Sequence, residues 1–160
     1  MKGKFGCTCL LAVFLVLGFG AASWGSTWNL ITPGETHYNE VVTRLGHPTV
    51  RTEESRAIRN VSKVIHCVWE GSDAPQGYER VDILFNMDSL LPLLIAAQPA
   101  NMPRSEVHKE YGMPERTETT SSGNVEDHYD ILGMAVTYLP DGKTVRKMEF
   151  FEGIMGSYGR

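Results

Sequence analysis

The stretch "THYNEVVTRLGHPT", residues 36–49, contains the start, one apolar face and the end of a short helix. Thr36 is a favoured N-cap residue because its hydroxyl can accept a hydrogen bond from the first helical turn. The apolar positions recur at i, i+3, i+4 and i+7, which is one face of a helix: Tyr38, Val41, Val42 and Leu45. Gly46 suits the left-handed conformation that ends a helix, and Pro48 prevents its continuation.

A second, more degenerate copy, "MPRSEVHKEYGMPE", occupies residues 102–115. A shift of 66 residues aligns five identical pairs: Pro33 with Pro99, Glu40 with Glu106, Val41 with Val107, Gly46 with Gly112 and Pro48 with Pro114. Pro103 suits the first turn of the second helix. Because most of the matched residues begin, pack or end a helix in both copies, we predict an internal duplication.

Strand-like segments follow each helix. After the second copy they are residues 127–132, 134–139 and 144–151, and Asp141-Gly142 is typical of a hairpin turn between the last two. After the first copy they are residues 63–70, 78–85 and 90–97. Pro92 restricts the last of these to a sheet edge or a bulge, and a short helix is the alternative for that segment.

These patterns predict an α+β fold made of two tandem repeats. Each repeat is a short helical segment packed on a three- to four-stranded antiparallel meander, and we expect the two repeats to share one sheet. The first covers residues 30–97 and the second residues 98–152, with a tail at residues 153–160. One such unit of about 60 residues is marginal alone, and joining two buries more surface per residue.

The first repeat is longer than the second. Asp88 and Asp141 lie in corresponding turns 53 residues apart, whereas the helices are 66 apart, so the first repeat carries 13 extra residues. We assign them to a polar loop at residues 70–77, "EGSDAPQG", and to residues 54–60, "ESRAIRN". Long loops in compact domains are often functional.

The N-terminus has the layout of a secretory signal peptide, which we assign to residues 1–25. Lys2 and Lys4 precede an apolar run at residues 10–22, too short to span a bilayer, and small residues follow. An uncleaved membrane anchor is the alternative reading, and it would be the chain's only link to a membrane. Residues 1–25 hold two lysines and no acid, so removing them takes the net charge from −4 to −6. An acidic mature chain argues against nucleic acid as a partner.

The stretches "TPGETHYNEVVTRLGHPT", residues 32–49, and "VTYLPDGKTVRKMEFF", residues 136–151, resemble the opening and closing segments of BamE-like (SmpA/OmlA) domains of the bacterial envelope. Tandem copies in an exported chain are similar in layout to the fold of the β-lactamase inhibitor proteins. This resemblance implies a periplasmic, secreted or envelope-associated protein. It transfers no functional residue, because such domains bind proteins through whole surfaces.

Strand alternation sorts the side chains onto two faces of the predicted sheet. The apolar set is assigned to the core beneath the helices: Val81, Ile83, Phe85, Tyr129, Ile131, Met134, Val136, Tyr138, Met148 and Phe150. Cys67 lies in an apolar run and is expected to be a buried, inert thiol. His37 and His108 are expected to lie on helices, in water. A second hypothesis is a metal site on the opposite face, where His66, Asp82, His128 and Asp130 would converge, although no close-spaced ligand pair is present.

No nucleophile elbow, reactive-cysteine context or glycine-rich phosphate loop is present in the sequence, so we predict a non-catalytic protein without a cofactor. The leading hypothesis is an exported adaptor or inhibitor-like module that binds another envelope protein through its open sheet face and the loop 70–77. The candidate contact residues are Trp69, Glu70, Asp73, Tyr78, Asp82 and His128. Trp69 and Tyr78 either flank the loop as interface anchors or pack in the core. A periplasmic module that binds a small ligand or a metal is the alternative.

Overall fold

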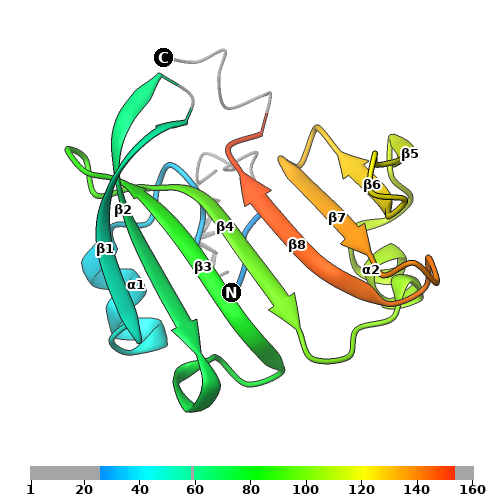
Figure 1. The fold of residues 1–160 in the computed structure, drawn as a ribbon, viewed down its shortest axis with the longest axis horizontal. Coiled ribbons are helices and arrows are strands. Elements are labelled where there is room, and N and C mark those ends of the chain that lie inside the picture. Colours follow the sequence, from blue (N-terminus) through cyan, green and yellow to red (C-terminus); the bar gives the residue numbers. More distant parts are fainter. Residues whose placement is uncertain (1–25, 59, 154–160) are drawn as a thin grey trace, which may run out of the picture.

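The computed structural model describes residues 26–58 and 60–153. The predicted signal peptide and nearly all of the predicted tail therefore lie outside the described residues. Two helices, α1 (Tyr38–Leu45) and α2 (Arg104–Tyr111), lie on one face of an eight-stranded antiparallel sheet (Figure 1). The strands are β1 (Val50–Ile58), β2 (Val61–Glu70), β3 (Tyr78–Asn86), β4 (Pro92–Pro99), β5 (Arg116–Thr119), β6 (Val125–Tyr129), β7 (Met134–Tyr138) and β8 (Val145–Phe151).

The predicted α+β fold with two repeats in one sheet is confirmed. Each helix precedes a four-stranded meander, and the strand order is β1-β2-β3-β4-β8-β7-β6-β5. The two meanders join where the last strand of each pairs with the other, β4 with β8, in antiparallel register. At the centre of this junction Ala96 pairs with Glu149. These two residues are equivalent under the shift of 53, so a local twofold axis relates the repeats.

The same side-chain contact fixes the helix in each repeat. The indole Nε1 of Trp69 donates to the carbonyl oxygen of Gly46 at 3.1 Å, and the hydroxyl of Tyr129 donates to that of Gly112 at 3.2 Å. The two glycines end α1 and α2 with φ of 83° and 85°. Each contact ties the end of a helix to the second strand of its meander, so the duplication extends to tertiary contacts.

The sequence indicates three strand segments in each repeat, and the structure has four strands. The additional strands are the outermost ones, β1 and β5. β1 has the sequence VRTEESRAI and β5 has RTET, and most of their side chains are exposed on both faces. Neither strand shows the alternation that marks a half-buried strand. Charged, polar edge strands of this kind discourage pairing with other molecules. Residues 54–58 of the "ESRAIRN" segment therefore belong to β1, whereas the predicted loop at residues 70–77 connects β2 with β3.

Residues 90–97 form the strand β4 from Pro92 onward rather than a helix. β4 lies in the middle of the sheet, between β3 and β8. Pro92 is tolerated there because it is the first residue of the strand and because the register with β3 shifts between Leu84 and Phe85. The expected bulge is present, whereas the alternative expectation of an edge position is wrong.

Three local predictions need correction. The N-cap of α1 is His37, whose Nδ1 accepts from the amide of Asn39, and not Thr36, whose hydroxyl accepts from the amide of Thr32. Pro103 is the N-cap of α2 rather than a residue of its first turn. Ile131 is exposed because the chain turns after Tyr129 and leaves the sheet.

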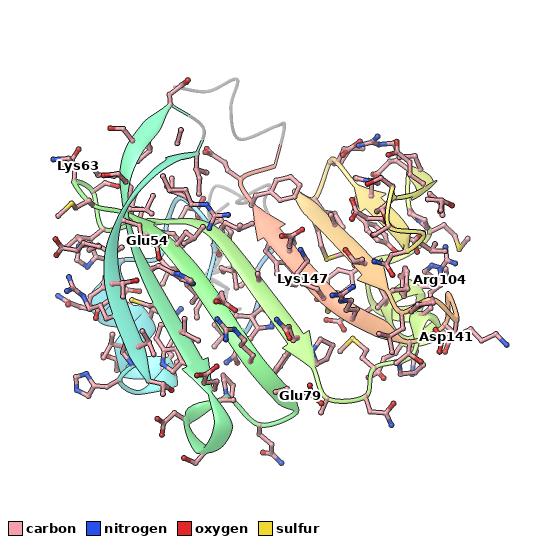
Figure 2. All side chains as sticks on the ribbon, viewed as in Figure 1. Glu54, Lys63, Glu79, Arg104, Asp141 and Lys147 are labelled. Atoms are coloured by element: carbon pink, nitrogen blue, oxygen red, sulfur yellow. The ribbon has the colours of Figure 1, made fainter. Side chains whose placement is uncertain are left out.

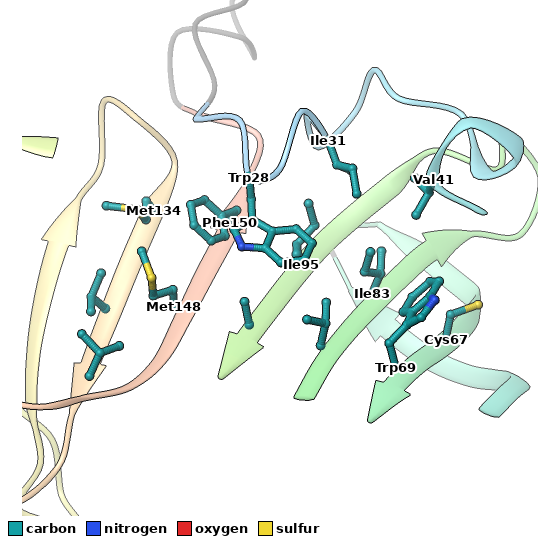
Figure 3. Packing of buried hydrophobic residues seen from close by; sticks show 14 of the residues in the cluster. Trp28, Ile31, Val41, Cys67, Trp69, Ile83, Ile95, Met134, Met148 and Phe150 are labelled. Atoms are coloured by element: carbon teal, nitrogen blue, oxygen red, sulfur yellow. The ribbon is translucent and has the colours of Figure 1, made fainter. Parts of the chain in front are cut away.

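The core lies between the helices and the sheet, and the segment after residue 25 completes it. Trp28 and Ile31 are almost fully buried, and in Figure 3 the indole of Trp28 lies over Phe150 of β8 and Ile95 of β4. The ring of Trp28 also makes an edge-to-face contact with the ring of Tyr78, with 5.2 Å between the ring centroids. Ser26 donates its amide and its hydroxyl to the carbonyl of Leu132. We call residues 26–31 the strap. The strap covers the junction of the two repeats between α1 and α2.

Candidate partner-binding surface

The sheet face opposite the helices is covered by no described helix or loop, and it is continuous across both repeats (Figure 1). Cross-strand pairing places one row of side chains along its centre, through all eight strands: Val50, Val68, Asp82, Ala96, Glu149, Ala135, His128 and Arg116. We call this surface the open face. Figure 2 shows its side chains from both repeats, including Glu54 on β1 and Lys147 on β8.

In the first repeat the open face carries a chain of ion pairs. His66 contacts Glu54 through Nδ1 at 3.0 Å and Asp82 through Nε2 at 2.8 Å. Arg80 then contacts Asp82 through Nε at 2.7 Å and Glu70 through Nη1 at 2.8 Å. Burial alone would raise the pKa of Asp82, but the hydrogen bonds from Arg80 and His66 outweigh burial and lower it. The carboxylate is therefore charged and held in place.

The second repeat carries a separate network on the same face. His128 contacts Glu126 at 3.0 Å, and Arg116 contacts Glu118 and Asp130. Thr137 donates to Glu126 at 3.1 Å, and Lys147 contacts Glu149 at 2.9 Å. These pairs are partly exposed and contribute little to stability. They fix the position of the side chains, which is what a specific protein interface requires.

An apolar patch separates the two networks at the junction of the repeats. Leu84, Leu94 and Phe151 lie in register on β3, β4 and β8, and Ala96 follows Leu94 on the same face. Leu84 is buried, whereas Leu94, Ala96 and Phe151 are partly exposed. We call these four residues the seam patch. An apolar centre with a charged rim is the usual anatomy of a protein–protein interface.

The six predicted contact residues do not form one surface. Glu70, Asp82 and His128 lie on the open face, as their strand positions predicted, but they belong to two different networks. Asp73 lies in the loop 70–77, where it accepts a hydrogen bond from Thr49 at 3.2 Å.

The two aromatic candidates point to the helix side. Trp69 is fully buried and holds Gly46, so it packs in the core and is not available to a partner. Tyr78 is half-buried against Trp28. Trp69 follows the alternation of its strand, which places it opposite the ion pairs. Tyr78 has the parity of Arg80 and lies on the helix side because the register shifts between these two residues.

The suggested metal ligands do not converge. His66 lies on β2 and His128 on β6, with four strands between them. Both ring nitrogens of His66 already contact carboxylates. Within residues 26–58 and 60–153, no group of three or more histidine, cysteine, aspartate and glutamate side chains is placed to hold a metal ion.

The loop 70–77 forms one wall of a pocket of about 660 Å³ on the helix side. The C-terminal end of α1, with Arg44 and His47, forms another wall, and Asn29 of the strap completes the rim. The second repeat has only a short turn between β6 and β7 at the corresponding place. The insertion that lengthens the first repeat therefore supplies one wall of this pocket.

The second repeat contains a buried charge cluster that the sequence did not predict. Asp127 is fully buried and accepts hydrogen bonds from four side chains: Thr117, Arg104, His108 and Tyr138. His108 was expected to lie in water and instead contacts this carboxylate at 3.1 Å. Asp127 and Tyr129 lie two residues apart on β6, so their side chains face the same side of the sheet, and the alternation assigns Tyr129 to the core. That spacing is the observation that could have revealed an inward-facing acid.

Cys67 occupies the position in the first repeat that corresponds to Asp127 in the second. It is fully buried, and burial raises the pKa of its thiol to about 11. The thiol is therefore protonated and unreactive at neutral pH, as predicted. Cys7 and Cys9 lie outside the described residues.

Comparison with protein-family models, curated proteins and solved structures finds no match for this chain. The resemblance to BamE-like domains therefore stays a prediction. Among the described residues no helix combines the length and the apolar character that crossing a bilayer requires.

Proposed function

We propose that this chain is an exported, non-catalytic module that binds another envelope protein through the open face, as an adaptor or an inhibitor. The observation that carries the proposal is an eight-stranded sheet with both helices on one face and no described element on the other. Antiparallel sheets with one free face are common. The proposal therefore also needs a surface of suitable size and chemistry.

The size of the open face suits a stable complex. Eight strands about 4.8 Å apart span roughly 35 Å, and strands of this kind are about 20 Å long. The resulting area of about 700 Å² is close to the roughly 800 Å² that each partner contributes to an interface of standard size. Both repeats are needed to reach it, which gives the duplication a functional reason.

The chemistry of the open face supports the same conclusion. The seam patch offers an apolar centre that water must leave on binding, and the ion pairs around it are already ordered. Acidic side chains outnumber lysine and arginine in the two networks: Glu54, Glu70, Asp82, Glu118, Glu126, Asp130 and Glu149 stand against Arg80, Arg116 and Lys147. We therefore expect the partner to present an apolar side chain within a basic surface.

Substitution of Leu94 tests this proposal. Leu94→Glu places a charge in the seam patch, and we expect it to lower the affinity for the partner at least tenfold, because a desolvated charge would lie at the centre of the interface. The measurement is quantitative capture of the partner from native envelopes by the tagged mature chain. Met113→Glu is the matched control, because Met113 is exposed and apolar but lies after α2, away from the open face.

Thermal unfolding of both variants shows whether each one folds. If Leu94→Glu folds and captures the same partner as well as the parent chain does, the open face is not the binding surface. Loss of capture by both variants would also argue against a role specific to the seam patch.

A further inference from the structure

The pocket beside the loop 70–77 is a fixed feature of the first repeat. The loop begins with a short 3₁₀ turn, Gly71–Asp73, and Gly71 and Gly77 adopt φ of 62° and 86°, which favour glycine. The amide of Tyr78 donates to the carbonyl of Pro75 at 3.0 Å, and that of Ala100 donates to Gly77 at 3.0 Å. The hydroxyl of Thr49 bridges the carboxylate of Asp73 and the backbone of Glu70. These contacts hold the wall of the pocket in place.

Four polar side chains line the pocket and form no hydrogen bond within the part of the chain that the structure describes. They are Asn29, His47, Ser72 and Gln76. They come from three separate segments, namely the strap, the end of α1 and the loop. The two charged side chains of the pocket wall are engaged, Arg44 with Glu40 and the carbonyl of Leu30, and Asp73 with the hydroxyl of Thr49. Asn29, His47, Ser72 and Gln76 are exposed, so their donors and acceptors are open to a bound molecule.

The walls combine opposite charges with apolar surface. Arg44 lies on the helix wall and Asp73 on the loop wall, so the pocket favours neither an anion nor a cation. Leu45, Pro75 and the ring of Tyr78 supply apolar contact. At the rim, Asn29 and Leu30 have positive φ of 48° and 64°, and Leu30 is 74% exposed. A large apolar side chain held outward at the tip of a tight turn adds contact area beside the hollow.

We propose that this pocket binds a short, extended peptide segment of a protein partner. The amides of Asn29 and Gln76 each offer a carbonyl and an NH₂ group, which match the alternating donors and acceptors of a peptide backbone. A volume of about 660 Å³ lies within the usual range for ligand pockets, roughly 300–1,000 Å³. The proposal rests on the proposed function only in that the peptide belongs to a protein partner. The pocket lies on the helix side and is separate from the open face.

Selection from a phage-displayed library of linear seven-residue peptides, against the tagged mature chain, tests the proposal. The most enriched peptide is then synthesised, and its dissociation constant is measured by calorimetry. Ser72→Trp places a bulky ring in the pocket, and we expect it to weaken peptide binding at least tenfold. Ser121→Trp is the matched control at an exposed position in the turn between β5 and β6, away from this pocket, and it should leave binding unchanged.

Two further variants keep the test decisive. If Ser72→Trp does not fold, the double substitution His47→Ala with Gln76→Ala removes two free polar groups at exposed positions and should weaken binding at least fivefold. Leu94→Glu should leave peptide binding unchanged while it lowers capture of the envelope partner. Failure of the open-face proposal and failure of the pocket proposal are thus distinguishable.

Three outcomes would overturn the pocket assignment. They are no enriched peptide from the library, equal binding of the selected peptide by folded pocket variants, and binding of oligosaccharides from a glycan array in place of peptides. Enrichment of peptides that the pocket variants no longer bind would support it.

Discussion

At the scale of single residues, one buried position beneath the helix holds chemically different side chains in the two repeats. Cys67 in the first repeat packs beneath α1 as a small apolar side chain, whereas Asp127 in the second repeat is a buried carboxylate. Asp127 is stable there because Arg104 supplies two hydrogen bonds to it and Tyr138, Thr117 and His108 supply one each. A buried charge that is fully hydrogen-bonded becomes costly only when one side of the pair is removed.

We expect Asp127→Asn to lower the free energy of unfolding by about 3 kcal/mol, because it leaves the Arg104 guanidinium without its charged partner. Arg104 is partly exposed, which keeps the loss at the lower end of the range for buried pairs. Urea unfolding followed by tryptophan fluorescence measures it, with Cys67→Ala as the apolar comparison. A loss below 1 kcal/mol would contradict the role assigned to this cluster.

The same carboxylate makes stability depend on pH. Burial alone would raise the pKa of Asp127, but hydrogen bonds from Thr117, His108, Arg104 and Tyr138 outweigh it and lower the pKa below its usual 3.8. The unfolded chain therefore binds this proton more readily, so the stabilisation is complete above about pH 4 and is lost as the pH falls further. Unfolding free energies between pH 2 and pH 7 should show a shallower acid slope for Asp127→Asn than for the parent chain. Equal slopes would show that another carboxylate controls acid unfolding.

At the scale of elements, each helix is fixed by the glycine and proline that end it and by one tertiary hydrogen bond. The glycines that end α1 and α2 were predictable from the sequence, because Leu-Gly-x-Pro and Tyr-Gly-x-Pro allow few other conformations. The hydrogen bonds from Trp69 and Tyr129 were not predictable, since the strands that carry them are distant in sequence. The edge strands β1 and β5 were missed for a related reason. Their residues carry no burial pattern, and only pairing with β2 and β6 makes them strands.

Tyr129→Phe removes only the hydrogen bond to Gly112 and preserves the packing of the ring. We expect it to lower the free energy of unfolding by about 1 kcal/mol. Native-state hydrogen exchange should locate the loss in α2 rather than in α1, because α1 has its own anchor in Trp69. Equal acceleration of exchange in both helices would contradict two independent anchors.

At the scale of the whole molecule, the duplication produces one sheet rather than two domains. The local twofold axis at Ala96 and Glu149 places the last strands of the repeats side by side, and the strap with Trp28 and Ile31 covers the junction on the helix side. The strand alternation predicted which side chains line the open face, and it predicted most of the core. It did not predict the strap, because Trp28 and Ile31 belong to no periodic segment.

The candidate site was predictable only in part for the same physical reason. Positions such as Asp82 and His128 follow from strand parity, whereas the seam patch depends on the pairing of β4 with β8. The pocket likewise depends on how the loop 70–77 meets α1. Both features are created by contacts between segments that are far apart in the sequence.

Site-specific photocrosslinking in the native envelope tests the central claim most directly. A photoreactive amino acid replaces Ala96 or Ala135 on the open face, and Thr43 on the exposed side of α1 serves as the control position. We predict that Ala96 and Ala135, which come from different repeats, crosslink to one and the same protein and that Thr43 does not. Crosslinks to that protein from Thr43 and none from either alanine would contradict the assignment of the open face as the binding surface.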